Sequence, residues 1–162
     1  MSLLRKNRNY RLLFTATAIS QLGSGVSKLA MPWMATLLTR DAVLISMVTA
    51  AGALPWLLFT IPAGVIIDRA NRQHMMVQGD VARMILTFGL MALAFGYTAT
   101  RTDDTLIYLL IILSFLFGVA KVFRDNAAQT ALPGIVDRDD LETANGQMWS
   151  VGEIAGQFIG PP

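Results

Sequence analysis

One segment of the sequence restricts the possible folds more than any other: no Asp, Glu, Lys or Arg occurs between Ala42 and Ile67. As an α-helix, about 20 apolar residues at ~1.5 Å each cross the ~30 Å hydrocarbon core of a bilayer. The segment is therefore long enough to span a membrane. Asp68, Arg69 and Arg72 follow it directly, and loops rich in Lys and Arg stay on the cytoplasmic face. The sequence thus predicts a membrane protein in which this span ends in the cytoplasm.

The composition agrees with a membrane location. Hydrophobic residues make up 54% of the 162 residues and charged residues 15%, against ~25% charged in ordinary soluble domains. The formal net charge of +2 does not indicate nucleic acid, because the cations lie at the ends of apolar segments and not in one aromatic-interleaved patch. Since the chain has no Cys, it has neither a disulfide framework nor a thiolate metal site. We expect a lipid bilayer as its surroundings and no nucleic acid, metal or cofactor as a partner.

Five apolar segments are expected to cross the bilayer as helices, because an open strand edge in lipid leaves backbone groups unpaired. They are residues 12–38, 42–67, 75–100, 105–128 and 143–162. So small a chain lacks the polar surface needed to hide five such segments in a soluble core. Most cations lie near the ends on the side of the N-terminus and the 68–72 loop, whereas only Arg40 and Arg101 lie on the opposite side. This asymmetry predicts a multi-pass protein of the cell (inner) membrane with a cytoplasmic N-terminus.

The loop after the second segment carries the most specific motif. Residues 64–73 read Gly-Val-Ile-Ile-Asp-Arg-Ala-Asn-Arg-Gln. They resemble the loop signature of the major facilitator superfamily, Gly-x-x-x-Asp-Arg-x-Gly-Arg-Arg/Lys, with Asn71 in place of Gly and Gln73 in place of the last cation. Gly64 would let its helix approach a neighbour closely, and Asn71 would take the left-handed backbone of a tight turn. A basic loop that only sets topology is the alternative.

Other stretches resemble the exporter branch of this superfamily, which includes enterobactin exporters and macrolide-efflux proteins. They are residues 8–12, 20–23, 30–33, 80–83, 132–133 and 141–145. The resemblance covers essentially the whole chain and implies the first four helices and most of the fifth in a twelve-helix transporter. We therefore expect an all-α membrane protein in which residues 1–162 form an N-terminal bundle, truncated before the second half. The sequence departs from many drug antiporters at Ser114, where those carry an Arg.

The resemblance also implies a function: a secondary active transporter that exports a small molecule from the cytoplasm by alternating access, driven by protons. It further implies a loop network that latches the two halves of the transporter in one conformation. The candidate latch residues are Gly64, Asp68, Arg69, Arg72, Asp80 and Arg83. Asp80 and Arg83 lie three residues apart and can neutralise each other on one helix face. We expect this pair to join Arg69 or Arg72 and the 124–125 region.

The fifth segment contains a stripe of small residues. Gly152, Gly156 and Gly160 recur every four positions and are followed by Pro161. This resembles the Gly-Pro signature in the fifth helix of exporters, and generic close packing of helices is the alternative.

Ionisable groups inside the hydrocarbon are candidates for function because each costs ~2.5–3.5 kcal/mol on insertion scales. Lys28 and Glu153 are such groups. Glu153 is a candidate coupling residue and Lys28 a candidate contact for a substrate anion. A structural ion pair between them, or a snorkelling lysine, are the alternatives.

A short internal echo adds two further candidates. The sequence Gly-Val-Ser-Lys that ends at Lys28 recurs as Gly-Val-Ala-Lys at Lys121. Transporters with inverted repeats place such counterpart helices around a central cavity. With Arg124 one turn beyond Lys121, the cavity would be cationic. An anionic or amphipathic small molecule is then the expected substrate, with the proton as the coupling ion.

Two rival functions are also considered. A membrane-embedded lipid-modifying enzyme would need clustered acids with a nucleophile or metal set, but the only dense acids, Asp137, Asp139 and Asp140, lack histidine partners. We therefore do not expect an enzyme. The other rival is an inactive fragment that requires its missing C-terminal half.

Overall fold

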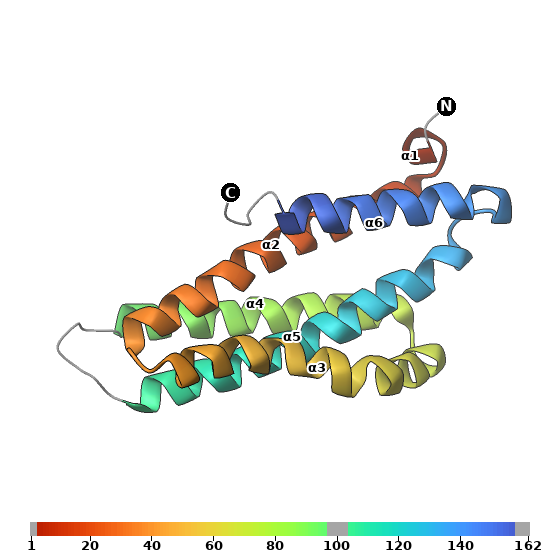
Figure 1. Cartoon of the computed structure of the whole chain (residues 1–162). Coiled ribbons are helices and arrows are strands. Elements are labelled where there is room, and N and C mark those ends of the chain that lie inside the picture. Colours follow the sequence, from red (N-terminus) through yellow and green to blue (C-terminus); the bar gives the residue numbers. More distant parts are fainter. Residues whose placement is uncertain (1–2, 97–103, 158–162) are drawn as a thin grey trace.

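The computed structural model describes residues 3–96 and 104–157, and every element in these ranges is helical. The long helices are α2 (Arg8–Leu38), α3 (Ala42–Arg69), α4 (Arg72–Gly96) and α5 (Asp104–Ala131), and α6 (Leu141–Gln157) lies along α2 (Figure 1). A short α1 (Leu3–Lys6) precedes α2, and two 3₁₀ turns, η1 (Leu132–Gly134) and η2 (Arg138–Asp140), connect α5 to α6. The expected all-α class is confirmed.

The observed helices follow the five expected segments with shifted ends. Helix α4 begins at Arg72, three residues before the expected position 75, and α5 continues to Ala131 beyond the expected position 128. Residues 97–100 of the third segment and 158–162 of the fifth lie outside the described residues. That all five helices cross the bilayer and form one N-terminal bundle stays a prediction.

Three helices within the described ranges are long and apolar enough to cross a membrane. They are Ala42–Arg69, Arg72–Phe95 and Thr105–Gly134. Their outward faces suit lipid: Leu57 and Ile61 on α3 are both 81% exposed. Helix α2 has 31 residues, but Ser, Thr, Gln and Lys side chains along one face lower its mean hydropathy. Helix α6 is described over 17 residues.

Side chains that cap helix N-termini explain where the helices begin. The carboxylate of Asp41 accepts a hydrogen bond from the Val43 N–H at 2.8 Å, and Asn71 Oδ1 accepts from the N–H groups of Gln73 and His74 at 3.0 and 3.2 Å. Asn and Asp are preferred at this position because they satisfy N–H groups that have no partner within the helix. The expected left-handed backbone at Asn71 is wrong, since no non-glycine residue in the described ranges has a positive φ. Asn71 serves the loop as a helix cap.

Helix α5 is the central element and packs against both α3 and α4. It crosses α3 at Gly118, where an added Cβ would lie 2.5 Å from the Gly52 carbonyl oxygen and 2.9 Å from Pro55 Cγ. It crosses α4 at Gly79, where an added Cβ would lie 2.8 Å from Arg124 Cβ. Both glycines allow the backbones to approach closely, as small residues do in membrane helix bundles. This arrangement fixes the positions of the polar side chains on α4 and α5.

Candidate functional site

A cavity of about 530 Å³ lies between α2, α3, α5 and α6. Its wall includes three of the predicted site residues, Lys28 of α2, Lys121 of α5 and Glu153 of α6. Residues far apart in the sequence are thus brought to one cavity. The first and fourth expected spans both contribute a lysine to it, at the two positions of the internal echo.

Apolar side chains line the cavity between the charged groups. Met31, Val48 and Phe117 are buried residues of this wall. Gly25, Gly52 and Gly118 also line the cavity. Ligand sites commonly combine an apolar wall with a few polar or charged groups, and this cavity has that character. The expected ion pair between Lys28 and Glu153 stays a prediction.

A polar cluster adjoins the cavity where α2 meets α4 and α5. The guanidinium of Arg83 donates hydrogen bonds to the hydroxyl of Ser20 at 2.6 Å and to that of Ser24 at 2.7 Å, and a weaker one to the Ser20 carbonyl at 3.3 Å. The Arg83 Cζ atom also lies 5.0 Å from the ring centroid of Phe117, within the range of a cation–π contact. Arg83 therefore ties α4 to two successive turns of α2.

Arg124 is the second arginine of the cluster and is fully buried. Its Nε lies 3.5 Å from Asp80 Oδ1, its Nη1 lies 3.5 Å from Asp125 Oδ1, and its Nη2 donates to Thr17 Oγ1 at 3.3 Å. Buried charges are tolerated when they are paired and hydrogen-bonded. The Nε atoms of Arg83 and Arg124 are buried without a hydrogen-bond partner, although the ion pair to Asp80 partly compensates the latter.

Lys121 connects the polar cluster to the cavity. Its ammonium donates to Asp125 Oδ2 at 2.5 Å and to Gln21 Oε1 at 3.2 Å. Lys121 and Gln21 line the cavity, whereas Asp125 does not. The cluster therefore holds three cations, Arg83, Arg124 and Lys121, against the two carboxylates of Asp80 and Asp125.

The structure places the predicted latch residues in two groups. Asp80 lies 3.8 Å from Arg83 and 3.5 Å from Arg124, as the expected link to the 124–125 region requires. Asp68, Arg69 and Arg72 are exposed at the turn between α3 and α4, and they form no ion pair with the residues that the structure describes. The partner of Asp80 across helices is therefore Arg124 and not Arg69 or Arg72, because the side chain of Asp80 points toward α5 and α2.

Among the other candidates, Arg124 does not line the cavity, since it lies behind Lys121 in the polar cluster. Gly152 lines the cavity. Within the described ranges, an added Cβ at Gly152 or Gly64 would meet no heavy atom within 4 Å. Gly156 lies in α6, and Gly160 and Pro161 fall outside the described residues. The packing role of these glycines stays a prediction.

Sequence reasoning missed the residues of α2 that hold the arginines. Thr17, Ser20 and Ser24 are spaced by three and four residues, so they share one helix face, and Gln21 and Lys28 continue it. Polar residues at helical spacing inside an expected span were the available signal. The arginine partners on α4 and α5 were not visible from spacing, because their distance from α2 depends on how the helices cross.

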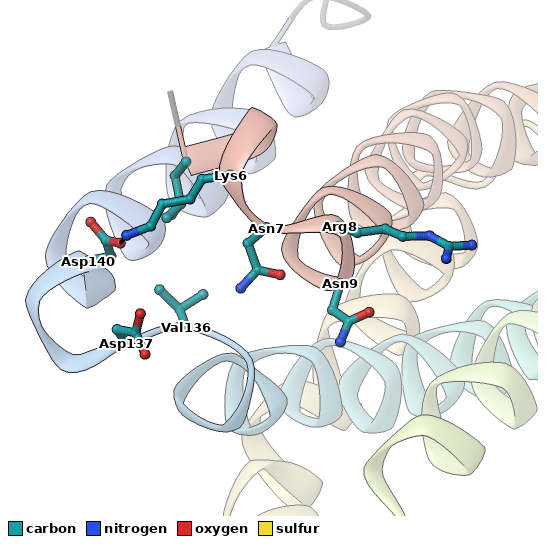
Figure 2. A pocket seen from close by; sticks show the side chains of 8 residues that line it. Lys6, Asn7, Arg8, Asn9, Val136, Asp137 and Asp140 are labelled. Atoms are coloured by element: carbon teal, nitrogen blue, oxygen red, sulfur yellow. Dashed lines mark hydrogen bonds and ion pairs between the residues drawn. The ribbon is translucent and has the colours of Figure 1, made fainter. Parts of the chain in front are cut away.

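A second, smaller cavity of about 280 Å³ lies beside the N-terminal end of α2 (Figure 2). Lys6 points toward Asp140, with 3.5 Å between Nζ and Oδ2, and Asn7 Nδ2 donates to the Ile135 carbonyl at 2.7 Å. Nearby, the Tyr10 hydroxyl lies 2.9 Å from Gln147 Oε1, and burial raises the pKa of Tyr10. These contacts join α1 and the start of α2 to the connection that precedes α6 and to α6 itself. The described residues contain no group of three or more His, Asp or Glu placed to hold a metal ion.

Curated proteins with similar sequences are efflux pumps. The chain is 28% identical to the multidrug efflux pump Tap of Mycobacterium tuberculosis over 149 residues, covering 91% of this chain and 32% of that protein. It is 24% identical to macrolide efflux protein A of Streptococcus pyogenes over 156 residues, covering 94% of this chain and 37% of that protein. The chain thus spans about a third of the length of these relatives. No solved structure matches it significantly.

The comparison with protein families gives the broadest match. The transmembrane secretion effector family of major facilitator transporters matches residues 2–162, which is almost the whole chain. The match includes the cavity, the polar cluster and the loop motif. Helical class, apolar spans and family match agree on a multi-pass membrane protein. The chain belongs to the transmembrane secretion effector family of the major facilitator superfamily.

Proposed function

We propose that this chain is the N-terminal part of a secondary active transporter that exports a small molecule from the cytoplasm by alternating access. The observation that carries the proposal is the cavity lined by Lys28, Lys121 and Glu153. Ionisable side chains at membrane depth mark transport pathways. The names of the relatives, multidrug efflux pump and macrolide efflux protein, support the direction of transport. The N-terminus lies in the cytoplasm and the helices span the cell (inner) membrane.

The substrate in this proposal is an anionic or amphipathic small molecule. Lys28 and Lys121 provide two positive charges in the cavity wall, and Glu153 provides one negative charge. Met31 and Phe117 provide apolar contact area beside them. A molecule with an apolar body and one negative charge fits both parts of this wall. In this environment of low dielectric, its attraction to the lysines is stronger than in water.

The proton is the coupling ion in this proposal, and Glu153 is its carrier. A carboxyl group that reaches a transport cavity can bind a proton on one side of the membrane and release it on the other. Export driven by an inward proton gradient is antiport, so the proton and the cargo must occupy the transporter alternately. Glu153 would take up a proton on the outer side in exchange for cargo and release it to the cytoplasm before cargo binds again.

The loop between α3 and α4 acts as the latch of this cycle. Asp68, Arg69 and Arg72 are exposed there, so they are accessible to the part of the transporter that the relatives have beyond this chain. Asp80 and Arg83 then act from inside the bundle, because they lie in the polar cluster. Gly64 provides open space next to the loop, since nothing lies within 4 Å of an added Cβ.

Flux measurements on the complete protein in proteoliposomes test this function. We expect export of an aromatic anion to follow an imposed pH gradient in the wild type. Glu153→Gln should remove this dependence, whereas Glu142→Gln, at an exposed position outside the cavity, should keep it. Lys28→Ala should raise KM for the anion about threefold to tenfold, since an ion pair of this kind contributes about 1 kcal/mol. If export by Glu153→Gln depends on the pH gradient as in the wild type, Glu153 does not carry the coupled proton.

A further inference from the structure

The pair formed by Lys121 and Asp125 is the part of the polar cluster that reaches the cavity. The ammonium of Lys121 reaches the cavity wall next to Gln21, and its side chain is 31% exposed. The carboxylate of Asp125 lies behind it, is 15% exposed, and binds the ammonium at 2.5 Å. Any anion that enters the cavity and approaches Lys121 therefore meets an ammonium that already has a counter-ion.

We propose that Asp125 is an internal competitor for anionic cargo at Lys121, and so sets the affinity of the cavity for anions. The inference rests on the proposed function and deepens it. A bound anion attracts the ammonium toward the cavity, and Asp125 attracts it back. The carboxylate keeps cargo binding weak enough for release, which transport requires as much as binding.

Two features of the pair make it exchangeable. Lys121 precedes Asp125 by four residues on α5, and this order, cation first, is the weaker orientation of an i,i+4 pair on a helix. Asp125 also has a second cation close by, because Arg124 Nη1 lies 3.5 Å from its other oxygen. When Lys121 moves toward an anion, the Asp125 carboxylate keeps one positive neighbour. Its desolvation cost is therefore partly compensated in both arrangements.

Lys121 can also move without losing all of its hydrogen bonds. An ammonium has three N–H donors, and Gln21 Oε1 accepts one of them at 3.2 Å from the cavity side. Arg124 cannot replace Lys121 in this role, since it is fully buried and does not line the cavity. Lys121 is thus the group through which Asp125 acts on cargo, and Asp125 is a positioning residue.

The test compares salicylate with its uncharged amide, salicylamide, on the complete protein. In detergent, Asp125→Asn should lower the Kd of salicylate about threefold to tenfold, since it removes one partly exposed ion pair, and should leave that of salicylamide unchanged. In proteoliposomes, the same variant should show a lower KM and a lower kcat for salicylate, because slower dissociation delays release. A variant that only damages the fold would weaken the binding of salicylate and of salicylamide alike.

Matched variants make the comparison sharper. Asp139→Asn makes the same change of charge at an exposed position outside the cavity and should behave as the wild type. Asp125→Glu keeps the charge and should keep the wild-type affinity. In a Lys121→Gln background, Asp125→Asn should no longer change the Kd of salicylate, as a double-mutant cycle requires for coupled residues.

The inference is overturned if Asp125→Asn weakens or does not change salicylate binding, if it changes both probes equally, or if no variant binds salicylate. The experiment distinguishes failure of the export proposal from failure of the Asp125 proposal. If neither probe is transported but Asp125→Asn lowers the Kd of salicylate, the protein is not an exporter of these probes and Asp125 still competes with the anion. If salicylate is exported with equal KM values in the wild type and Asp125→Asn, the export proposal holds and the competition by Asp125 is contradicted.

Discussion

At the scale of single residues, two buried arginines dominate the interior. Arg83 and Arg124 come from different helices, and both bind hydroxyl groups of α2. A planar guanidinium with five donors can bind several acceptors in fixed directions, which a lysine cannot do. The hydroxyls of Thr17, Ser20 and Ser24 are therefore acceptors that this junction requires.

The first prediction concerns Arg83. We expect Arg83→Lys to lower the stability of the folded protein by about 2–3 kcal/mol, because a single ammonium cannot bind both Ser20 and Ser24 in the same directions, and hydrogen bonds to charged groups contribute ~1.5–3 kcal/mol each. Thermal unfolding in detergent, followed by tryptophan fluorescence, measures the change. Arg72→Lys is the matched control at an exposed position. Equal melting temperatures for Arg83→Lys and the control would show that the two hydrogen bonds of the Arg83 guanidinium to Ser20 and Ser24 contribute nothing to stability.

At the scale of elements, glycines decide how closely α5 approaches its neighbours. At Gly118 the carbonyl of Gly52 and the ring of Pro55 leave no room for a methyl group. The Gly152–Gly156–Gly160 stripe is the more regular pattern in the sequence. Gly118 nonetheless approaches a neighbouring helix more closely than Gly79 does, whereas an added Cβ at Gly152 meets nothing within 4 Å, because helix crossing points need one small residue on each helix and not a long stripe.

The second prediction follows from this crossing. Gly118→Ala should destabilise the protein by about 1–3 kcal/mol, since the added methyl group forces α3 and α5 apart, as overpacking does. Gly146→Ala is the matched control on α6, where an added Cβ meets nothing within 4 Å. The control should be stabilising by about 0.5–1 kcal/mol because alanine favours a helix over glycine. Melting temperatures of the two variants in the same detergent give the comparison, and a stabilising effect of both would contradict the observed crossing.

At the scale of the whole molecule, α2 joins the other helices through apolar contacts near both ends and polar contacts between them. Near its N-terminal end, Tyr10 and Leu13 pack with Ala128 and Leu132. Near its other end, a second apolar cluster that includes Met31 and Ala35 packs with α3, α4 and α5. Between these clusters, Arg83, Arg124 and Lys121 donate hydrogen bonds to polar side chains in the middle of α2. Polar contacts can exchange partners with little change in packing, so we expect cargo binding to change the contacts of this middle part of α2.

The third prediction concerns membrane topology. The chain has no cysteine, so single cysteines can be introduced without background. With a cytoplasmic N-terminus, Arg40→Cys should react with a membrane-impermeant maleimide added outside intact cells, and Gln73→Cys should react only after the membrane is opened. Both positions are exposed in the structure. Labelling of both cysteines from the same side would contradict the prediction that α3 crosses the bilayer between them.

The sequence by itself determined the helical class, the membrane location and the approximate helix ends. These follow from local properties: the length of apolar runs and the absence of charge within them. It also pointed to Lys28 and Glu153, because a charge in an apolar run stands out, and to Lys121, through the internal echo. It led us to expect a link from Asp80 and Arg83 to the 124–125 region, but it did not determine that Arg124 is the partner of Asp80 there. Nor did it determine that Asp125 lies behind Lys121 at the cavity. Such contacts depend on the distance and angle between helices, which close approach at Gly79 and Gly118 sets, and only the tertiary structure contains that geometry.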